Sequence, residues 1–164
     1  MRPLLRSMNI KTELAKFCKS FTYAVSGIIY CIKTQRNMRF HMGAAGAVAV
    51  VAILCSVSIG EALALLLTVG GVMALECVNT AIENAVDLAS KGERSEMAKA
   101  AKDCAAGAVL IFCFAAIGVT ALVFGRRIIY ILGCFADSPA LIAAGVLYFV
   151  LWFWWVFVCF REKK

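Results

Sequence analysis

Four polar side chains recur at regular spacing where an apolar segment ends. They are Glu76, Asn79, Glu83 and Asp87. On an α-helix, at 100° per residue, the three acids fall within about 40° of one another and Asn79 lies about 60° to one side. The spacing therefore predicts one acidic stripe on a helix that emerges from hydrocarbon. Acids beside hydrocarbon are costly, which makes this stripe a candidate functional site.

Carboxylates in this arrangement support two kinds of chemistry. They bind a hard divalent cation through oxygen, and they accept a proton from a hydroxyl as a general base. Asn79 adds a neutral donor and acceptor, while Lys99 and Lys102, one loop away, supply positive charge for phosphate. Acid, metal and lysine beside a lipid phase are what phosphoryl transfer onto a membrane-dissolved alcohol requires. Because the chain has neither a GxxxxGK[ST] phosphate loop nor a kinase glycine loop, its nucleotide site would be unconventional.

Two other classes of protein remain open from the pattern alone. An acidic stripe at a helix end is often only solvated, as it would be in a structural membrane subunit. A proton- or ion-conducting helix is the second alternative, although the acids gather at one end and the apolar segments carry no ionisable residue in mid-span. His41, at the entrance of the first apolar segment, is more typical of an interfacial residue than of a ligand.

The composition indicates that membrane helices position this stripe. Of the 164 residues, 63% are hydrophobic and 16% are charged, against roughly 45–50% and about 25% in soluble domains. We therefore expect an all-α integral membrane protein. A net charge of +7 is typical of basic cytoplasmic loops beside anionic lipid rather than of nucleic-acid binding. The eight cysteines show no CxxC or paired pattern, which argues against a metal or disulfide framework.

The hydrophobic pattern predicts one surface helix and four spans. Basic and aromatic residues at helical spacing over 11–40 predict an N-terminal amphipathic helix in the membrane interface. The long apolar runs predict spans at about 42–59, 62–89, 99–124 and 139–160. We expect a polar loop at 90–96 and an outer turn at 125–138. The chain then divides into a membrane domain, 1–125, and an extra span with a basic tail, 126–164.

The distribution of Lys and Arg predicts the orientation of the chain. Fifteen of the 17 basic residues lie before the first span, in 90–103, or after the fourth span. The positive-inside rule then places both termini and the middle loop in the cytoplasm. The second predicted span is about 42 Å long, so its acidic end projects beyond a hydrocarbon core of ~30 Å on that side. The N-terminal segment lacks the apolar core and cleavage site of a secretory signal peptide.

Two stretches of the chain resemble one known family. ALECVNTAIENAVDL, followed by AKAAKDCAAGAV, strongly resembles the prokaryotic diacylglycerol kinase and undecaprenol kinase family, and FTYAVSGIIYCIKTQRNMRFH resembles its N-terminal amphipathic segment. The resemblance covers about 16–125. It implies a small three-span protein with a surface helix, assembled as a homotrimer with active sites between subunits. It also implies ATP- and Mg²⁺-dependent phosphorylation of a lipid alcohol at the bacterial inner membrane.

The resemblance also assigns roles to individual residues. Glu76 matches the general base that deprotonates the lipid hydroxyl, and Asn79 matches the asparagine that supports it. Glu83 matches a carboxylate ligand of Mg²⁺. The positions that contact the nucleotide are matched by Lys16, Tyr23, Lys102 and Asp103.

The chain departs from the family pattern at three places. Gln35 stands where the family has a second metal-binding glutamate, so we expect weaker Mg²⁺ binding, with an inactive or structural homologue as the alternative. The loop SKGERSEM is about one residue longer than usual and lacks an aromatic–His pair. The span at 139–160 is additional, and we expect it at the trimer periphery. The KTxRN and NTAIE motifs favour undecaprenol as substrate, with diacylglycerol next.

Overall fold

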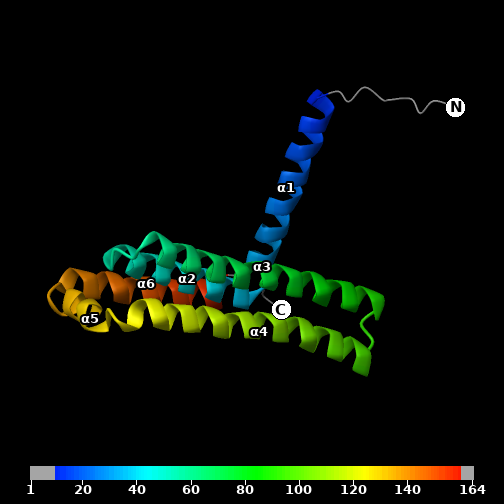
Figure 1. The fold of residues 1–164 in the computed structure, drawn as a ribbon. Coiled ribbons are helices and arrows are strands. Elements are labelled where there is room, and N and C mark those ends of the chain that lie inside the picture. The colour runs from blue at the N-terminus through cyan, green and yellow to red at the C-terminus, as the bar shows by residue number, and fades with distance from the viewer. Residues whose placement is uncertain (1–9, 160–164) are drawn as a thin grey trace.

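The computed structural model describes residues 10–159, which form six α-helices (Figure 1). The helices are α1 Ile10–Thr34, α2 Arg36–Leu54, α3 Ile59–Ala89, α4 Glu96–Gly125, α5 Ile128–Ala136 and α6 Pro139–Phe157. No strand occurs in this range. Four helices, α2, α3, α4 and α6, are long and apolar enough to cross a membrane. The sequence-based expectation of an all-α multi-pass membrane protein is confirmed.

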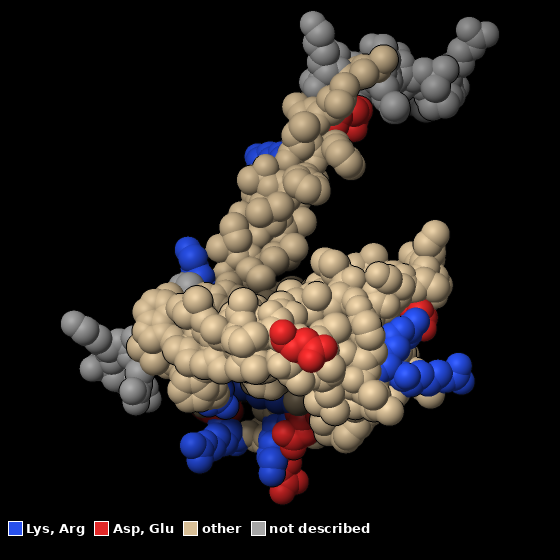
Figure 2. Space-filling view, turned by 90° about the vertical axis from the view of Figure 1, so that its left-hand side faces the viewer, with Lys and Arg blue, Asp and Glu red and all other residues tan. Residues whose placement is uncertain are grey.

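The four spanning helices form one bundle, from which α1 projects (Figure 1). Helices α3 and α4 make the most extensive contact, as an antiparallel hairpin closed by the loop after Ala89. Gly71 permits their close approach, because a methyl group at this position would overlap the ring of Phe112. The space-filling view shows α1 standing clear of the bundle, and its described side chains are exposed from Glu13 to Tyr30 (Figure 2).

The prediction of one N-terminal helix over 11–40 is wrong at its end. The chain breaks at Gln35, which has an extended backbone with φ −101° and ψ 117°, and residues 36–40 belong to the first span. Arg39 stabilises this break. Its Nη1 donates to the carbonyls of Ile32 at 2.8 Å and Lys33 at 3.1 Å, which are orphan acceptors of the last turn of α1.

The outer turn predicted at 125–138 contains a short helix, α5, that the sequence did not reveal. Its entry is fixed by Arg127, whose Nη1 and Nη2 donate to the carboxylate of Glu61 at 2.8 and 3.0 Å. The hydrogen bonds that Arg127 donates to Glu61 raise the pKa of the guanidinium above its ordinary value. Glu61 also completes a capping box with Ser58 at the start of α3. One ion pair thus joins both turns at this end of the bundle.

The fourth span, α6, packs on the small-residue face of α2. The hydroxyl of Tyr148 donates to the carbonyl of Gly43, and the indole of Trp152 lies directly over Gly43. A second glycine, Gly46, lies beneath the Tyr148 hydroxyl. The predicted end of this span at Phe160 and the basic tail after it lie outside the described residues, as do the first nine residues. The small residues therefore serve close helix packing, as such residues do in membranes.

Gly43→Ala should weaken the attachment of α6 to α2. The added methyl group would overlap a rigid indole ring, and overpacking of this kind costs about 1–3 kcal/mol. We expect a lower midpoint of thermal unfolding in detergent, together with a change in tryptophan fluorescence. Gly118→Ala is the matched control, because a Cβ there meets no atom within 4 Å. Equal midpoints for the two variants would contradict the packing described.

Candidate functional site

A cluster of two amides and one carboxylate lies where α1 ends and α2 begins. Asn79 Nδ2 donates to Glu83 Oε1 at 3.0 Å, one turn along α3. Gln35 Nε2 donates to Glu83 Oε2 at 3.3 Å from the break between helices. Both carboxylate oxygens therefore have an amide partner. Asn79 is 6% exposed, and its Oδ1 atom is buried without a hydrogen-bond partner in the described structure.

Glu76 lies two turns before Glu83, about 10 Å along the helix axis, and is buried. Only 2% of the residue is exposed. Its Oε1 atom lies 3.4 Å from Nε2 of His41 on α2, and the Sγ atom of Cys113 on α4 lies 3.9 Å from the same nitrogen. Three spanning helices thus meet around one carboxylate.

The backbone beside Glu76 is tied to α1. Thr80 donates its hydroxyl to the Glu76 carbonyl at 2.8 Å, and the Sγ atom of Cys31 lies 3.2 Å from that hydroxyl oxygen. Cys31 and Thr80 are 1% and 3% exposed. This small buried contact sets how the last turns of α1 sit against α3, and hence where Gln35 meets Glu83.

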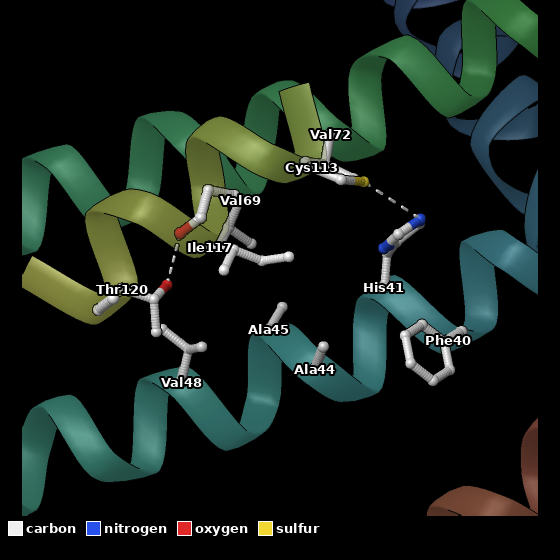
Figure 3. A pocket seen from close by; sticks show the side chains of 12 residues that line it. Phe40, His41, Ala44, Ala45, Val48, Val69, Val72, Cys113, Ile117 and Thr120 are labelled. Carbon is white, nitrogen blue, oxygen red and sulfur yellow. Dashed lines mark hydrogen bonds between the residues drawn. The ribbon is translucent and has the colours of Figure 1, made fainter. Parts of the chain in front are cut away.

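An apolar pocket of about 500 Å³ lies among α2, α3 and α4 (Figure 3). Alanine and valine side chains supply most of its wall, including Ala45 and Val69. His41 lies at one end and points from α2 toward Cys113, while Thr120 lies at the other (Figure 3). The Thr120 hydroxyl donates to the Ala116 carbonyl of its own helix at 2.7 Å. The pocket therefore suits hydrocarbon, with a polar group at the His41 end.

A second, polar cleft of about 640 Å³ lies over the α3–α4 loop. Lys99, Lys102 and Asp87 line it, and Lys102 forms an ion pair with Asp87. The loop turns sharply because Lys91 and Gly92 adopt left-handed backbone angles, with φ 51° and 79°. Two lysines on one side of a cleft of this size are suited to phosphate groups. Asp87, the last acid of the stripe, takes part in this cleft.

Three of the predicted nucleotide positions are not assembled within the chain. Lys16 pairs with Glu13 at 2.7 Å on the projecting part of α1, and lies about 27 Å along that helix from Thr34. Tyr23, on the same helix, is exposed and lies under the ammonium of Lys19. Asp103 is exposed on α4 and does not line the polar cleft. Lys102 is the nucleotide position that lies beside the stripe.

The donor set around Glu83 suits a hard cation shared with phosphate. In the part of the chain that the structure describes, no three His, Cys, Asp or Glu side chains cluster as a metal site. One carboxylate with the amide oxygens of Gln35 and Asn79 is nevertheless a set of oxygen ligands. Mg²⁺ is commonly held by one or two carboxylates together with substrate phosphates, so these residues fit it in that setting.

Two residues of the site were not identified from the sequence. His41 was interpreted as interfacial and Arg39 was not singled out, yet His41 contacts Glu76 and Arg39 is 5% exposed at the helix break. Residues 35 positions apart share no periodicity, so the pattern within one helix could not relate His41 to Glu76. The one available signal was a polar residue inside an otherwise small and apolar span.

Comparison with known proteins identifies the family of the chain. The family model described as prokaryotic diacylglycerol kinase matches residues 22–124. The undecaprenol kinase of Bacillus subtilis is 42% identical over 118 residues, which are 72% of this chain and 95% of that protein. The diacylglycerol kinase of Synechocystis sp. is 46% identical over 98 residues, 60% of this chain and 56% of that protein. No solved structure matches the chain.

The matched region contains the whole stripe, the helix break, the apolar pocket and the α3–α4 loop. It excludes α5 and α6, which follow it. A match over more than half of the chain, with relatives above 40% identity, decides the family. The chain belongs to the prokaryotic diacylglycerol kinase family and is a membrane lipid kinase.

Proposed function

We propose that the protein transfers the γ-phosphate of ATP to the hydroxyl of a membrane lipid alcohol in the presence of Mg²⁺. The observation that carries this proposal is the position of the buried Glu76. On one side, through His41, it adjoins an apolar pocket among three spans. On the other, along α3, it leads to Glu83 and to the lysine-lined cleft. The apolar pocket suits the chain of a lipid alcohol, and the lysine-lined cleft suits a nucleotide. The reacting oxygen of the lipid would lie between them.

Each predicted residue has a role in this reaction. Glu76 is the general base for the lipid hydroxyl, and Asn79 holds the carboxylate of Glu83 in place. Glu83 and Gln35 would hold Mg²⁺, which when bound supplies positive charge to the phosphates. Lys102 contacts the nucleotide phosphates from the cleft, and Asp103 lies next to it on the first turns of α4.

Undecaprenol is the acceptor that we favour, with diacylglycerol next. The Bacillus relative, which this chain matches over nearly its whole length, is named undecaprenol kinase. The pocket offers further support, because its Thr120 hydroxyl is already bonded to its own helix. The pocket therefore offers few free hydrogen-bond donors to the ester carbonyls of a diacylglycerol. A polyprenol has no carbonyl group that would need such a donor.

The exposed α1 supports a homotrimer with shared sites. Lys16 and Tyr23 contact residues of their own helix, and no contact joins either of them to the stripe in the described structure. A neighbouring subunit whose site received this helix would gain both residues, and the apolar side chains of α1 would be covered by protein and lipid. We place both termini in the cytoplasm of a bacterial cell, with the protein in the inner membrane. The division at residue 125 follows the end of the family match.

Purified protein in lipid should transfer labelled phosphate from ATP to undecaprenol, and more slowly to diacylglycerol. Glu76→Gln should lower the rate by about 10²–10⁴-fold, the range for loss of a general base. The same protein assayed without lipid measures background ATP hydrolysis. Phosphate on neither lipid would reject the kinase proposal in favour of an inactive homologue. A proton flux across vesicles would instead support the conducting alternative.

Gln35→Glu should lower the Mg²⁺ concentration needed for half-maximal activity. It places a second carboxylate opposite Glu83, where the amide now lies 3.3 Å away. Without metal the two charges repel, so the thermal midpoint of this variant should rise more with added Mg²⁺ than that of the unmodified protein. Asn37→Asp, an exposed position on α2, is the matched control for added charge. Identical Mg²⁺ responses in all three proteins would exclude Gln35 from the metal site.

Two inactive variants should restore activity when they assemble together. Tyr23→Ala damages the α1 contribution and Glu76→Gln damages the bundle contribution, so a mixed trimer contains some sites free of both changes. With random assembly of equal amounts, about one quarter of sites receive an intact bundle and an intact neighbouring α1. Phosphorylation by the mixture should approach that fraction of the unmodified rate. If the mixture is no more active than either variant, the shared site is excluded.

A further inference from the structure

The apolar pocket is faced by His41 and not by Glu76. His41 is among the residues that line the pocket, and its side chain is 21% exposed. The Glu76 side chain is 3% exposed, lies behind the imidazole, and is not part of the lining. A hydroxyl at the polar end of the pocket would therefore meet the imidazole before the carboxylate. Figure 3 shows the ring at this end, directed toward Cys113.

The two side chains approach each other through Nε2 of His41, which lies 3.4 Å from Oε1 of Glu76. A neutral imidazole carries a proton on one nitrogen and a lone pair on the other, so the ring can accept a proton beside the carboxylate. The carboxylate would stabilise the positive charge that the ring acquires. Carboxylates orient and support catalytic imidazoles in this manner in hydrolases of unrelated folds.

We propose that the proton acceptor of the lipid kinase is the His41–Glu76 pair, with His41 as the member that contacts the lipid hydroxyl. The inference rests on the proposed function and refines the role of Glu76. The lipid O–H bond breaks and its proton passes to the unprotonated nitrogen of the His41 imidazole. The oxygen lone pair forms the bond to the γ-phosphorus, and the bond from that phosphorus to the bridging oxygen breaks, its electron pair leaving with ADP. The imidazolium later returns the proton to water.

In the described structure, few polar groups face the His41 imidazole, which leaves it able to accept a proton. From α4, Cys113 offers a thiol 3.9 Å from Nε2, which is a weak contact. From α3, Glu76 is the charged group that faces it. A histidine that served packing alone would be sealed among apolar side chains, whereas this ring borders an open pocket. The apolar pocket lies on one side of the ring, and the buried Glu76 carboxylate of α3 lies on the other.

Substitution of His41 by glutamine separates proton transfer from positioning. His41→Gln keeps an amide donor for Glu76 but cannot take up a proton. We expect kcat to fall by about 10²-fold or more with the KM for ATP unchanged. A glutamine variant that keeps most of the activity would reduce His41 to a positioning residue and overturn the proposal. Thr68→Val is the control, because the Thr68 hydroxyl bonds to its own helix and does not line the pocket.

The double variant His41→Gln/Glu76→Gln tests whether the two residues act as one unit. Residues that act as a unit show strongly non-additive losses, so the double variant should be no slower than the slower single variant. If the fold-losses in rate of the two single variants multiply in the double variant, the proposal that the two residues act as a pair is overturned. If the unmodified protein phosphorylates no lipid, the proposed function fails and the catalytic role of His41 fails with it.

A readout without turnover tests the pair by itself. The chain contains a single histidine, so the imidazole ¹⁵N signals of protein in detergent micelles belong to His41. We expect one tautomer to predominate in the unmodified protein and a mixture of tautomers in Glu76→Gln. Signals that do not change in Glu76→Gln would show that no such pair exists, whatever the activity.

Discussion

A carboxylate buried among membrane helices needs polar partners. Glu76 is such a residue, and the packing of the helices around it depends on this need. With 2% of the residue exposed, water cannot solvate it, and ionised groups in such places are retained only when they are paired. His41 of α2 is the side chain that approaches the carboxylate. Thr80 bonds to the backbone carbonyl of Glu76, and Cys31 brings the end of α1 against Thr80. Packing of α1, α2 and α3 thus converges on one residue.

The break at Gln35 depends on the same packing. A continuous helix through this point would carry residue 35 onward along α1, whereas the extended Gln35 turns its amide toward Glu83. Arg39 keeps the break by bonding to carbonyls of α1 and, through Nε and Nη2, to the Val156 carbonyl of α6 at 3.4 and 3.3 Å. The position of a proposed metal ligand is therefore linked to the end of the fourth span.

The sequence predicted those features that follow from periodicity within one helix. Hydropathy located four spans, and the stripe from Glu76 to Asp87 follows from 3.6 residues per turn. Contacts between helices could not be predicted in this way, because relative rotation and register are set by packing. His41 against Glu76 is such a contact. Helix α5 was missed because a short apolar segment between turns carries too few residues to show a period.

Family resemblance supplied what periodicity could not, but only for residues within one chain. It placed Gln35 near the metal position, and the structure brings that residue to Glu83. It also assigned Lys16 and Tyr23 to the nucleotide, and the chain by itself leaves them on a projecting helix. A contact with a neighbouring copy, such as the one proposed above, would not form inside a single chain. Their roles remain predictions.

The contact between α6 and α2 also limits how copies of this chain can meet. The glycine face of α2 is the kind of surface that membrane helices use to associate closely. Here Tyr148 and Trp152, on α6 of the same chain, already occupy it. A tethered helix reaches its partner at a far higher effective concentration than a second molecule does. This face of α2 is therefore closed to a second copy of the chain, and a contact between copies would have to use the surfaces of α1, α3 and α4.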